Sequence, residues 1–100
     1  MELQRQYAAF QEAGTEVIAL VVAPIASVDG VRRTIGATYP LLADPAHRVA
    51  EAYGVYNLLG DGRAAPAVFV IGTDGRIVWN YIGQHANDRP GPGTILEQLP

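Results

Sequence analysis

The spacing of apolar side chains at the start of the chain predicts a helix followed by a strand. Leu3, Tyr7 and Phe10 recur every three or four residues, so a helix over residues 2–13 carries them on one face. A glycine follows, as is common where a helix ends. The next segment, EVIALVV at residues 16–22, is rich in β-branched residues and apolar on both faces. This pattern is typical of a strand covered on both sides, usually in a parallel sheet.

Helix-start signals organise the middle of the chain. Ser27 is placed to cap a helix over residues 28–36, because its hydroxyl can accept a bond from a free backbone N–H of the first turn. A short apolar run at residues 41–43 is consistent with a minor strand. Asp44 precedes a proline, and together they predict a further helix over residues 46–53 with Asp44 as its N-cap.

The last part of the chain has the pattern of a hairpin and a helix. Turn-forming residues at 57–65 predict a loop. AVFVIG at residues 67–72 and RIVWNYI at residues 76–82 are predicted strands, joined by an Asp-Gly pair that suits the positive φ angles of a tight hairpin. A short helix over residues 94–99 follows. This order of elements predicts an α/β sandwich with a mixed sheet, in a single domain over residues 1–100.

Composition narrows the classes of function. The chain has 100 residues, 49% of them hydrophobic, which suits one small domain with a single core. No apolar run approaches the roughly 20 residues of a transmembrane helix, so we expect no membrane span. The net charge of −3 argues against nucleic acid as a partner, because such proteins normally carry a basic patch. The amphipathic N-terminus is not a secretory signal, which favours the cytoplasm over export for this chain.

The chain contains no cysteine, and this excludes several kinds of chemistry. Disulfides, a thiolate nucleophile and cysteine-ligated zinc or iron–sulfur sites all need a thiol. A metal site can be drawn from two aspartates and two histidines: Asp44, His47, His85 and Asp88. We disfavour it, because Asp44 is explained as a helix cap and His85 as part of a polar loop. We expect no metal, no cofactor and no catalytic residue in this chain.

Other conspicuous side chains have structural explanations. Ser27, the single serine, is explained as a helix cap rather than a nucleophile, since no Gly-x-Ser-x-Gly motif surrounds it. Trp79 and Tyr81 alternate on one strand face, and we expect them to pack under a helix rather than to bind a ligand. Arg63 and Arg89 lie in predicted loops, where an anion site is an alternative to ordinary solvated charges.

Three longer stretches carry a resemblance to a known family. They are YAAFQEAGTEVIALV at residues 7–21, YPLLADPAHRVAEAYGV at residues 39–55 and AAPAVFVIGTDGRIVWNYIG at residues 64–83. Together they resemble the redoxin, or AhpC/TSA (alkyl hydroperoxide reductase and thiol-specific antioxidant), family of the thioredoxin-like superfamily, which includes the peroxiredoxins. The resemblance covers nearly the whole chain. It implies a thioredoxin-like fold and a thiol-dependent oxidoreductase that reduces peroxides or disulfides.

The resemblance also assigns a substrate-binding surface to Ala65 and Pro66. In proteins of this kind Pro66 would be a cis-proline that faces the reactive thiol, and the backbone beside it would hold a peptide, disulfide or peroxide. A polar residue often precedes that proline, and here Ala65 takes its place. Peroxiredoxins proper usually carry an arginine where this chain has Pro66. The chain therefore resembles the thioredoxin-like redoxins more than a peroxidase with a thiolate-stabilising arginine.

The chain departs from the family pattern at its beginning. The family's reactive cysteine follows a central strand that comes before the helix matching residues 2–13. This chain therefore resembles the C-terminal two-thirds of a redoxin, truncated at the N-terminus, and we expect no thiol peroxidase or disulfide reductase activity from it alone. In the family sheet, the missing strand lies between the strands that match residues 16–22 and 67–72. Both of these strands are then expected to expose unpaired edges.

Three responses to the missing strand are open. The two flanking strands pair directly, or a second copy completes the sheet in a homodimer, or the chain is a fragment of a longer protein. We favour a fragment that oligomerises through exposed sheet edges. The alternative function is a cysteine-free, thioredoxin-like binding module that takes a protein or peptide partner at the Pro66 surface or at a strand edge. An unrelated α/β domain that only mimics the pattern is a third, weaker alternative.

Overall fold

The computed structural model describes residues 2–100, which form five helices and four strands. In chain order the elements are α1 Glu2–Arg5, α2 Tyr7–Glu12, β1 Ala19–Val21, α3 Ile25–Ile35, β2 Leu41–Ala43, α4 Arg48–Ala52, β3 Ala67–Ile71, β4 Ile77–Ile82 and α5 Pro92–Glu97. The predicted order of helices, strands and hairpin is confirmed. Within the described residues, no helix has both the length and the apolar character to cross a membrane.

The predicted first helix is divided into α1 and α2. At Gln6 the backbone N–H donates to the carbonyl of Leu3 at 3.2 Å, which makes a tight turn between the two helices. The end of α2 agrees with the prediction. Gly14 has a φ of 72°, and the N–H of Thr15 reaches back to the carbonyl of Phe10 at 2.9 Å. This is a Schellman-type end, which favours glycine because a side chain is strained at that φ.

The parallel pair β1 and β2 is connected by α3. The register pairs Ala19 with Leu41 and Val21 with Ala43, so the strand predicted over residues 16–22 is shorter than expected. Only Ala19–Val21, the residues that pair with β2, form a regular strand. The predicted cap at Ser27 is wrong, because α3 begins directly after a proline and the N–H of Ser27 donates to that proline's carbonyl. Proline has no backbone N–H, and the N-cap position does not need one, so α3 can begin after Pro24.

The short helix α4 begins later than its sequence signal predicts. His47 takes the left-handed conformation with a φ of 50°, so the regular helix starts at Arg48 instead of residue 46. The predicted N-cap position is wrong, because the N-cap residue is His47 and not Asp44. Asp44 nevertheless caps the helix from three residues earlier. Its buried carboxylate accepts hydrogen bonds from the N–H groups of Val49 at 3.3 Å and Ala50 at 2.9 Å. These are two of the N–H groups that a helix start leaves without a partner inside the helix.

The antiparallel pair β3 and β4 forms the predicted hairpin. Gly75 has a φ of 83°, as a tight turn at Asp-Gly requires, and the pairing runs from Ala67 opposite Ile82 to a bulge after Val70. Trp79 packs against the cluster described below, so the expectation that it lies under a helix is confirmed. The last helix begins two residues earlier than predicted, since the proline at its start suits the first helical position.

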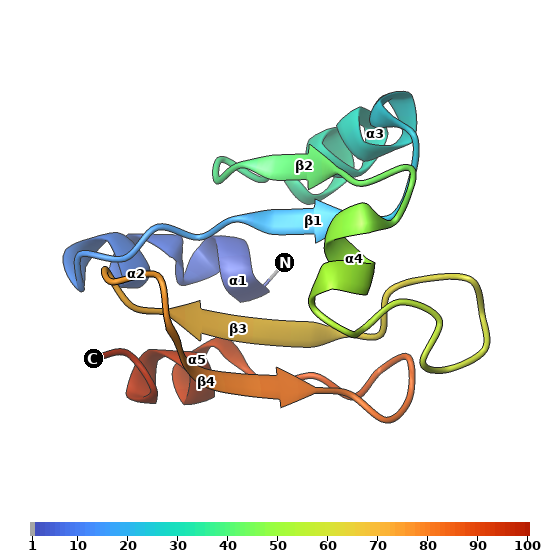
Figure 1. Ribbon diagram of the computed structural model, residues 1–100. Coiled ribbons are helices and arrows are strands. Elements are labelled where there is room, and N and C mark those ends of the chain that lie inside the picture. Colours follow the sequence, from blue (N-terminus) through green and yellow to red (C-terminus); the bar gives the residue numbers. More distant parts are fainter. Residues whose placement is uncertain (1) are drawn as a thin grey trace.

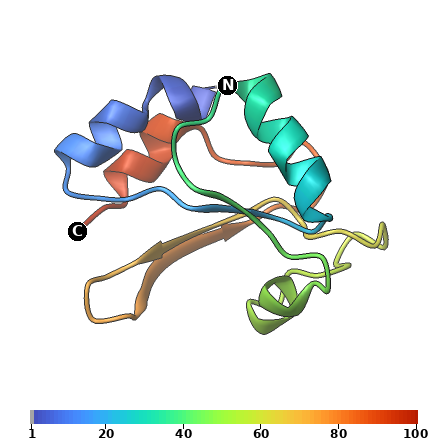
Figure 2. The same ribbon diagram turned by 90° about the horizontal axis from the view of Figure 1, so that it is seen from above.

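The helices cover the strands unequally. Figure 2 shows α1, α2, α3 and α5 on one face of the strands and α4 on the other. The buried residues of the first face form two clusters, one of Tyr7, Ala37 and Tyr39 and one of Phe10, Val70 and Ile95. On the other face, the ring of Tyr53 meets that of Phe69 edge to face at 4.8 Å. The core therefore lies mainly between α2, α5 and the strands.

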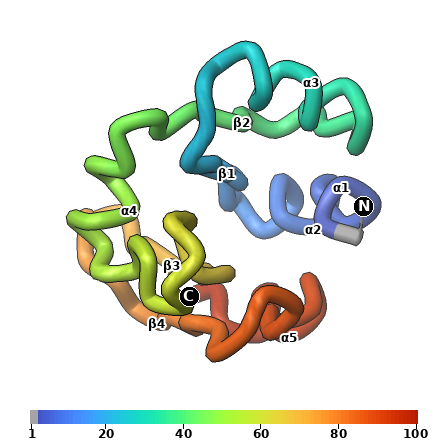
Figure 3. The backbone as a smooth tube through the Cα atoms, turned by 90° about the vertical axis from the view of Figure 1, so that its right-hand side faces the viewer, coloured from blue at the N-terminus to red at the C-terminus, as the bar shows by residue number. Residues whose placement is uncertain are grey.

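The four strands follow one another across the molecule but do not form one sheet. Figures 1 and 3 show the order β2, β1, β3, β4, with β1 and β3 facing each other. Within residues 2–100 the hydrogen bonds define two separate two-stranded sheets, β1 with β2 and β3 with β4. The alternative in which the strands at 16–22 and 67–72 pair directly is therefore wrong. Both segments instead pack against α2, because Val17 and Val68 contact the cluster that contains Phe10.

Candidate functional site

The Ala65–Pro66 segment lies at the entrance to β3, where two loops meet. Ala65 is buried, and its N–H donates to the carbonyl of Val55 at 2.9 Å. The carbonyl of Pro66 accepts a hydrogen bond from the N–H of Gly83 at 2.7 Å. No peptide bond within residues 2–100 is cis, so the cis-proline that the resemblance implies is not formed. The chain enters β3 with a trans Ala65–Pro66 bond. It is hydrogen-bonded to Val55 on one side and to Gly83 on the other.

The loop before Pro66 is closed by its own backbone. Asn57 has a φ of 57°, a conformation that asparagine tolerates better than most side chains. Its N–H donates to the carbonyl of Arg63 at 2.7 Å, and its side-chain oxygen accepts from the N–H of Gly62 at 2.8 Å. An isolated bridge between Tyr56 and Ala64 completes the closure. The loop therefore presents Arg63 from a fixed backbone position close to Pro66.

The loop after β4 is held against Pro66 by a close backbone approach at Gly83. A Cβ atom at this position would lie 2.2 Å from the carbonyl oxygen of Asp88 and 3.1 Å from that of Pro66. The distance to the Asp88 oxygen is shorter than any real Cβ contact, so only glycine fits here unless the backbone shifts. The side chain of Asp88 accepts hydrogen bonds from the hydroxyl of Tyr81 at 2.5 Å and from the N–H of Gln84 at 2.8 Å. These contacts fix the loop that leads to Arg89.

The Tyr81–Asp88 pair has shifted ionisation. The hydrogen bond from Tyr81, followed by the bond from the Gln84 N–H, lowers the pKa of Asp88 below its usual range. The same bond raises the pKa of Tyr81, because the phenolate would lose its acceptor and face a carboxylate. At neutral pH the pair is therefore a neutral phenol bonded to a carboxylate. The hydrogen bond between them holds the loop in place, and we assign the pair no role as a reactive acid.

The two loops together line a hollow beside Pro66. Its volume is about 220 Å³, and its lining consists of Leu59, Asp61, Arg63, Ala64, Pro66, Ala86 and Arg89. The structure thus brings Arg63 and Arg89 to the same place as Pro66. Arg89 also donates to the carbonyl of Ala86 at 3.0 Å. Among the ion pairs between described residues, neither arginine takes part, so both guanidinium groups are available to an anion.

The sequence interpretation named Arg63, Pro66 and Arg89 of this lining but not their association. Arg63 lies three residues before Pro66, so their closeness in space could have been predicted from their closeness in sequence. Arg89 is far from both in sequence, and its approach depends on the Gly83 contact and on the Tyr81–Asp88 bond. No sequence pattern predicts such a contact between two loops.

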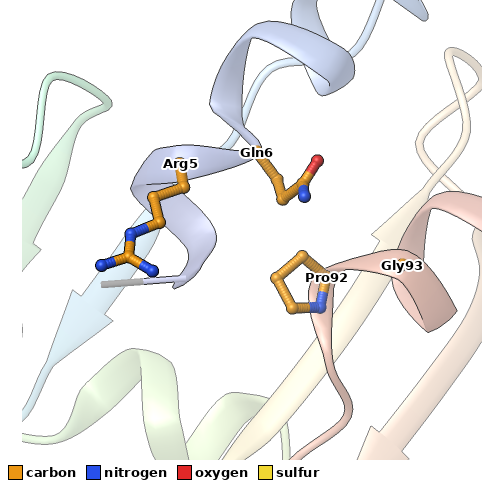
Figure 4. Close-up of a pocket in the computed structure, with 4 residues that line it drawn as sticks. All are labelled: Arg5, Gln6, Pro92 and Gly93. Atoms are coloured by element: carbon orange, nitrogen blue, oxygen red, sulfur yellow. The ribbon is translucent and has the colours of Figure 1, made fainter.

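A second hollow of about 190 Å³ lies where α1 approaches the start of α5. Figure 4 shows that Gln6 points towards Pro92, whereas the guanidinium of Arg5 points away from it. This hollow has one charged side chain in its lining and includes neither Ala65 nor Pro66. It therefore does not compete with the Pro66 hollow as the candidate site.

The histidines and aspartates considered for a metal do not come together. His47 stacks on Tyr56, with ring centroids 3.8 Å apart and planes 9° from parallel. Its Nδ1 lies 2.9 Å from a carboxylate oxygen of Glu51, although the two atoms are not aligned for a hydrogen bond. Asp44 uses its carboxylate to cap α4. Within the described part of the chain, no group of three or more histidine, cysteine, aspartate or glutamate side chains is placed to hold a metal ion.

Comparisons with known proteins agree with the observed fold. The crystal structure of Enterococcus faecalis AhpC superposes with a TM-score of 0.80 at 26% sequence identity, covering 97% of this chain and 60% of that one. The chain thus spans three fifths of the AhpC chain that it matches, and its α/β architecture is a corresponding part of the thioredoxin-like fold. No curated protein sequence matches the chain. The sequence model of the AhpC/TSA family matches residues 1–80, and the chain belongs to that family.

Proposed function

We propose that this chain is the cysteine-free part of a redoxin that reduces peroxides or disulfides by thiol chemistry. In this proposal residues 1–100 form the C-terminal portion of one thioredoxin-like domain, and the reactive cysteine comes from a segment outside them. The observation that carries the proposal is the Pro66 hollow with its two unpaired arginines, in a chain that belongs to the AhpC/TSA family and contains no cysteine. Ala65 and Pro66 supply the backbone surface on which the substrate rests.

Arg63 and Arg89 have a definite chemical role in this proposal. Positive charge lowers the pKa of a nearby thiol, and the thiolate is the nucleophile. A thiolate held beside Pro66 attacks a peroxide oxygen, so that an S–O bond forms and the O–O bond breaks. The products are a sulfenic acid and, after uptake of one proton, an alcohol or water, and a thiol donor then reduces the sulfenic acid. The guanidinium groups also stabilise the negative charge that develops on the leaving oxygen.

A peroxidase assay tests the proposal. The 100-residue chain alone, supplied with hydrogen peroxide and dithiothreitol, is expected to consume peroxide no faster than a blank. Fused to the part of Enterococcus faecalis AhpC that it does not cover, the same chain should turn over peroxide. Arg63→Gln or Arg89→Gln in the fusion should lower kcat/KM by about tenfold or more.

The control is Arg76→Gln, which removes another exposed arginine, from the hairpin turn and away from the hollow. It should leave kcat/KM unchanged. Turnover by the unfused chain would refute the proposal, as would an equal loss in all three variants. The intact mass of the native protein is a second test. A mass well above 10.7 kDa supports a longer redoxin, and a mass of 10.7 kDa favours the cysteine-free binding module.

A further inference from the structure

The hollow beside Pro66 is positively charged in a chain that is negative overall. Its lining holds two guanidinium groups, those of Arg63 and Arg89, and one carboxylate, that of Asp61. The side chains of the lining therefore sum to a charge of +1, whereas the whole chain has a net charge of −3. Figure 1 shows the two loops that supply them, before β3 and after β4, at the same end of the strands. A local charge of this sign attracts a small anion.

The sequence Asp-Gly-Arg occurs twice, and its two arginines differ in their partners. In each copy the aspartate Oδ1 accepts a hydrogen bond from the arginine N–H at 3.0 Å, Asp61 from Arg63 and Asp74 from Arg76. At the hairpin turn, Nε of Arg76 also lies 3.9 Å from Oδ2 of Asp74, which makes an ion pair. Among the ion pairs that the structure describes for residues 2–100, none includes Arg63. The same local turn therefore leaves one guanidinium available at the hollow.

The guanidinium of Arg89 is oriented by the backbone of its own loop. Its Nη2 donates to the carbonyl of Ala86 at 3.0 Å, and both residues line the hollow. The loop is in turn held by the hydrogen bond from Tyr81 to Asp88. The remaining N–H groups of the guanidinium stay available to a ligand. An orientation that is fixed before binding lowers the entropy that a ligand must overcome.

The rest of the lining decides which anion fits. It is apolar, and it consists of Leu59, Ala64, Pro66 and Ala86. An anion made of polar atoms alone, such as phosphate, would place oxygens against these side chains, and its second negative charge would exceed the charge of the lining. A carboxylate carries one charge, and its two oxygens match the planar donors of a guanidinium. The lining therefore favours a carboxylate that is attached to an apolar body.

The size of the hollow limits the apolar body. The hollow has a volume of about 220 Å³. A protein cavity of roughly 150 Å³ holds one molecule of benzene. The hollow therefore has room for an aromatic ring, or a short alkyl chain, together with the carboxylate.

We propose that the Pro66 hollow binds a small carboxylate with an apolar body, and that the substrate of the redoxin is an organic hydroperoxide carrying such a carboxylate. Arg63 and Arg89 bind the carboxylate, and the apolar lining contacts the body. The binding site follows from the residues of this chain, whereas the hydroperoxide rests on the proposed function.

The reaction of such a substrate balances with a thiol donor. The thiolate from the rest of the redoxin attacks the outer peroxide oxygen, so that an S–O bond forms and the O–O bond breaks. The sulfur keeps that hydroxyl as a sulfenic acid, and the alkoxide takes up a proton, which gives a hydroxy acid. Dithiothreitol then reduces the sulfenic acid to the thiol, with release of water, and is itself oxidised to its disulfide.

Benzoate binding to the 100-residue chain tests the site without thiol chemistry. Calorimetric titration with sodium benzoate should give a Kd on the order of 1 mM. Benzamide, the neutral analogue, and inorganic phosphate should each bind at least about tenfold more weakly. Absence of benzoate binding to the folded chain would overturn the proposal. Equal binding of benzamide, or tighter binding of phosphate, would overturn the carboxylate as the recognised group.

Arginine variants test which side chains bind the carboxylate. Arg63→Gln and Arg89→Gln should each weaken benzoate binding by about tenfold. Arg89→Lys keeps the charge but loses the planar donors, so its loss should be smaller, about threefold. The matched control is Arg76→Gln, which changes the arginine of the other Asp-Gly-Arg copy and should leave the Kd unchanged. An equal loss in the three glutamine variants would overturn the site.

A variant that tightens binding is a sharper test, because misfolding does not produce it. Asp61→Asn removes the one carboxylate of the lining, and its amide oxygen can still accept from the N–H of Arg63. Benzoate should bind about threefold more tightly at low ionic strength, and added salt should reduce this gain. Asp74→Asn makes the same change at the hairpin turn and should have no effect. An unchanged or weaker Kd in Asp61→Asn would overturn the charge argument.

The fusion with the uncovered part of AhpC tests the substrate class. We expect kcat/KM for the 4-carboxy derivative of cumene hydroperoxide to exceed that for cumene hydroperoxide at least about tenfold. Arg63→Gln and Arg89→Gln should bring this ratio close to one. The ratio compares two peroxides on the same thiolate, so a general loss of thiolate reactivity does not change it.

The two kinds of experiment separate the possible failures. A ratio near one in the unchanged fusion, with peroxide still consumed, would overturn the carboxylate-bearing substrate and leave the thiol function. A fusion that turns over neither peroxide, while the chain still binds benzoate, would refute the proposed function and support the carboxylate site.

Discussion

On the face covered by α2 and α5, Phe10 is 2% exposed, whereas on the opposite face Leu42 leaves 48% of its surface in solvent. Both side chains are large and apolar, and each comes from a regular element. The difference lies in what covers them, since within residues 2–100 the second face has α4 alone, with five residues. A chain of this size can complete one core, and it leaves the second face thinly covered and β1 and β3 without hydrogen bonds to each other.

The largest contrast between the faces is expected from paired truncations. Phe10→Ala removes a buried ring from the cluster with Val70 and Ile95, so the free energy of unfolding should fall by about 3–5 kcal/mol. Leu42→Ala, its control on the open face, should change it by no more than about 0.5 kcal/mol. Urea unfolding monitored by circular dichroism measures both. Similar losses would mean that both faces are packed alike in solution.

A smaller effect is expected at the contact between the two loops of the candidate site. Gly83→Ala forces a Cβ against the carbonyl oxygen of Asp88 and should lower the free energy of unfolding by about 1–3 kcal/mol. Gly93→Ala is the control, because it lies in helix α5 with open space around it and should stabilise slightly. If Gly83→Ala were harmless, the loop would not be held against Pro66 as described.

A variant at Asp44 tests whether the helix cap stabilises α4, the helix that covers the second face. Asp44→Ala removes the acceptor for the N–H groups of Val49 and Ala50 and should lower the free energy of unfolding by about 1–2 kcal/mol. Hydrogen exchange of these two amides should accelerate more than exchange in β4. Uniform acceleration throughout the chain would instead indicate that α4 does not open by itself.

The smallest effect is expected from the pH dependence of the Tyr81–Asp88 bond. The pKa of Asp88 is lowered in the folded chain, so its contribution to stability is complete above about pH 4 and is lost as the pH falls through the folded pKa. The pKa of Tyr81 is raised, so its contribution is present below about pH 10 and is lost as the pH rises through the folded pKa. NMR titration of the Asp88 carboxyl should follow the acid step.

Tyr81→Phe should move the pKa of Asp88 back towards its usual range and remove the alkaline step. The remaining bond from the Gln84 N–H keeps part of the depression, because it is independent of the hydroxyl. An unchanged pKa of Asp88 in this variant would show that the hydroxyl does not bond to the carboxylate in solution.

Local signals account for what could be predicted from the sequence. The Asp-Gly turn before β4 lies in the predicted place, and the side chain of Asp44 caps α4 although the N-cap residue is His47. Both signals act within a few residues. The start of α3 was missed because Ser27 and the preceding proline both suit a helix start, and the choice between them depends on how the chain leaves β1. The resemblance implied a cis bond at Pro66, and the observed bond is trans.

The candidate site was predictable only in part, for a related reason. The resemblance pointed to Ala65 and Pro66, and their role in binding substrate stays a prediction. The convergence of Arg63 and Arg89 needed a contact between two loops, which no local pattern carries. The unpaired edges of β1 and β3 were predicted from the missing strand, but whether the two strands would pair with each other depended on how they pack on α2.

The absence of backbone hydrogen bonds between the two sheets has a consequence for how the molecule unfolds. Each sheet is built from its own continuous stretch of chain, β1 to β2 before residue 44 and β3 to β4 after residue 66. Cooperativity between them must pass through side chains, chiefly the cluster around Phe10. We therefore expect the two stretches to exchange their amides at different rates, and a ligand that bridges them to merge the two rates into one.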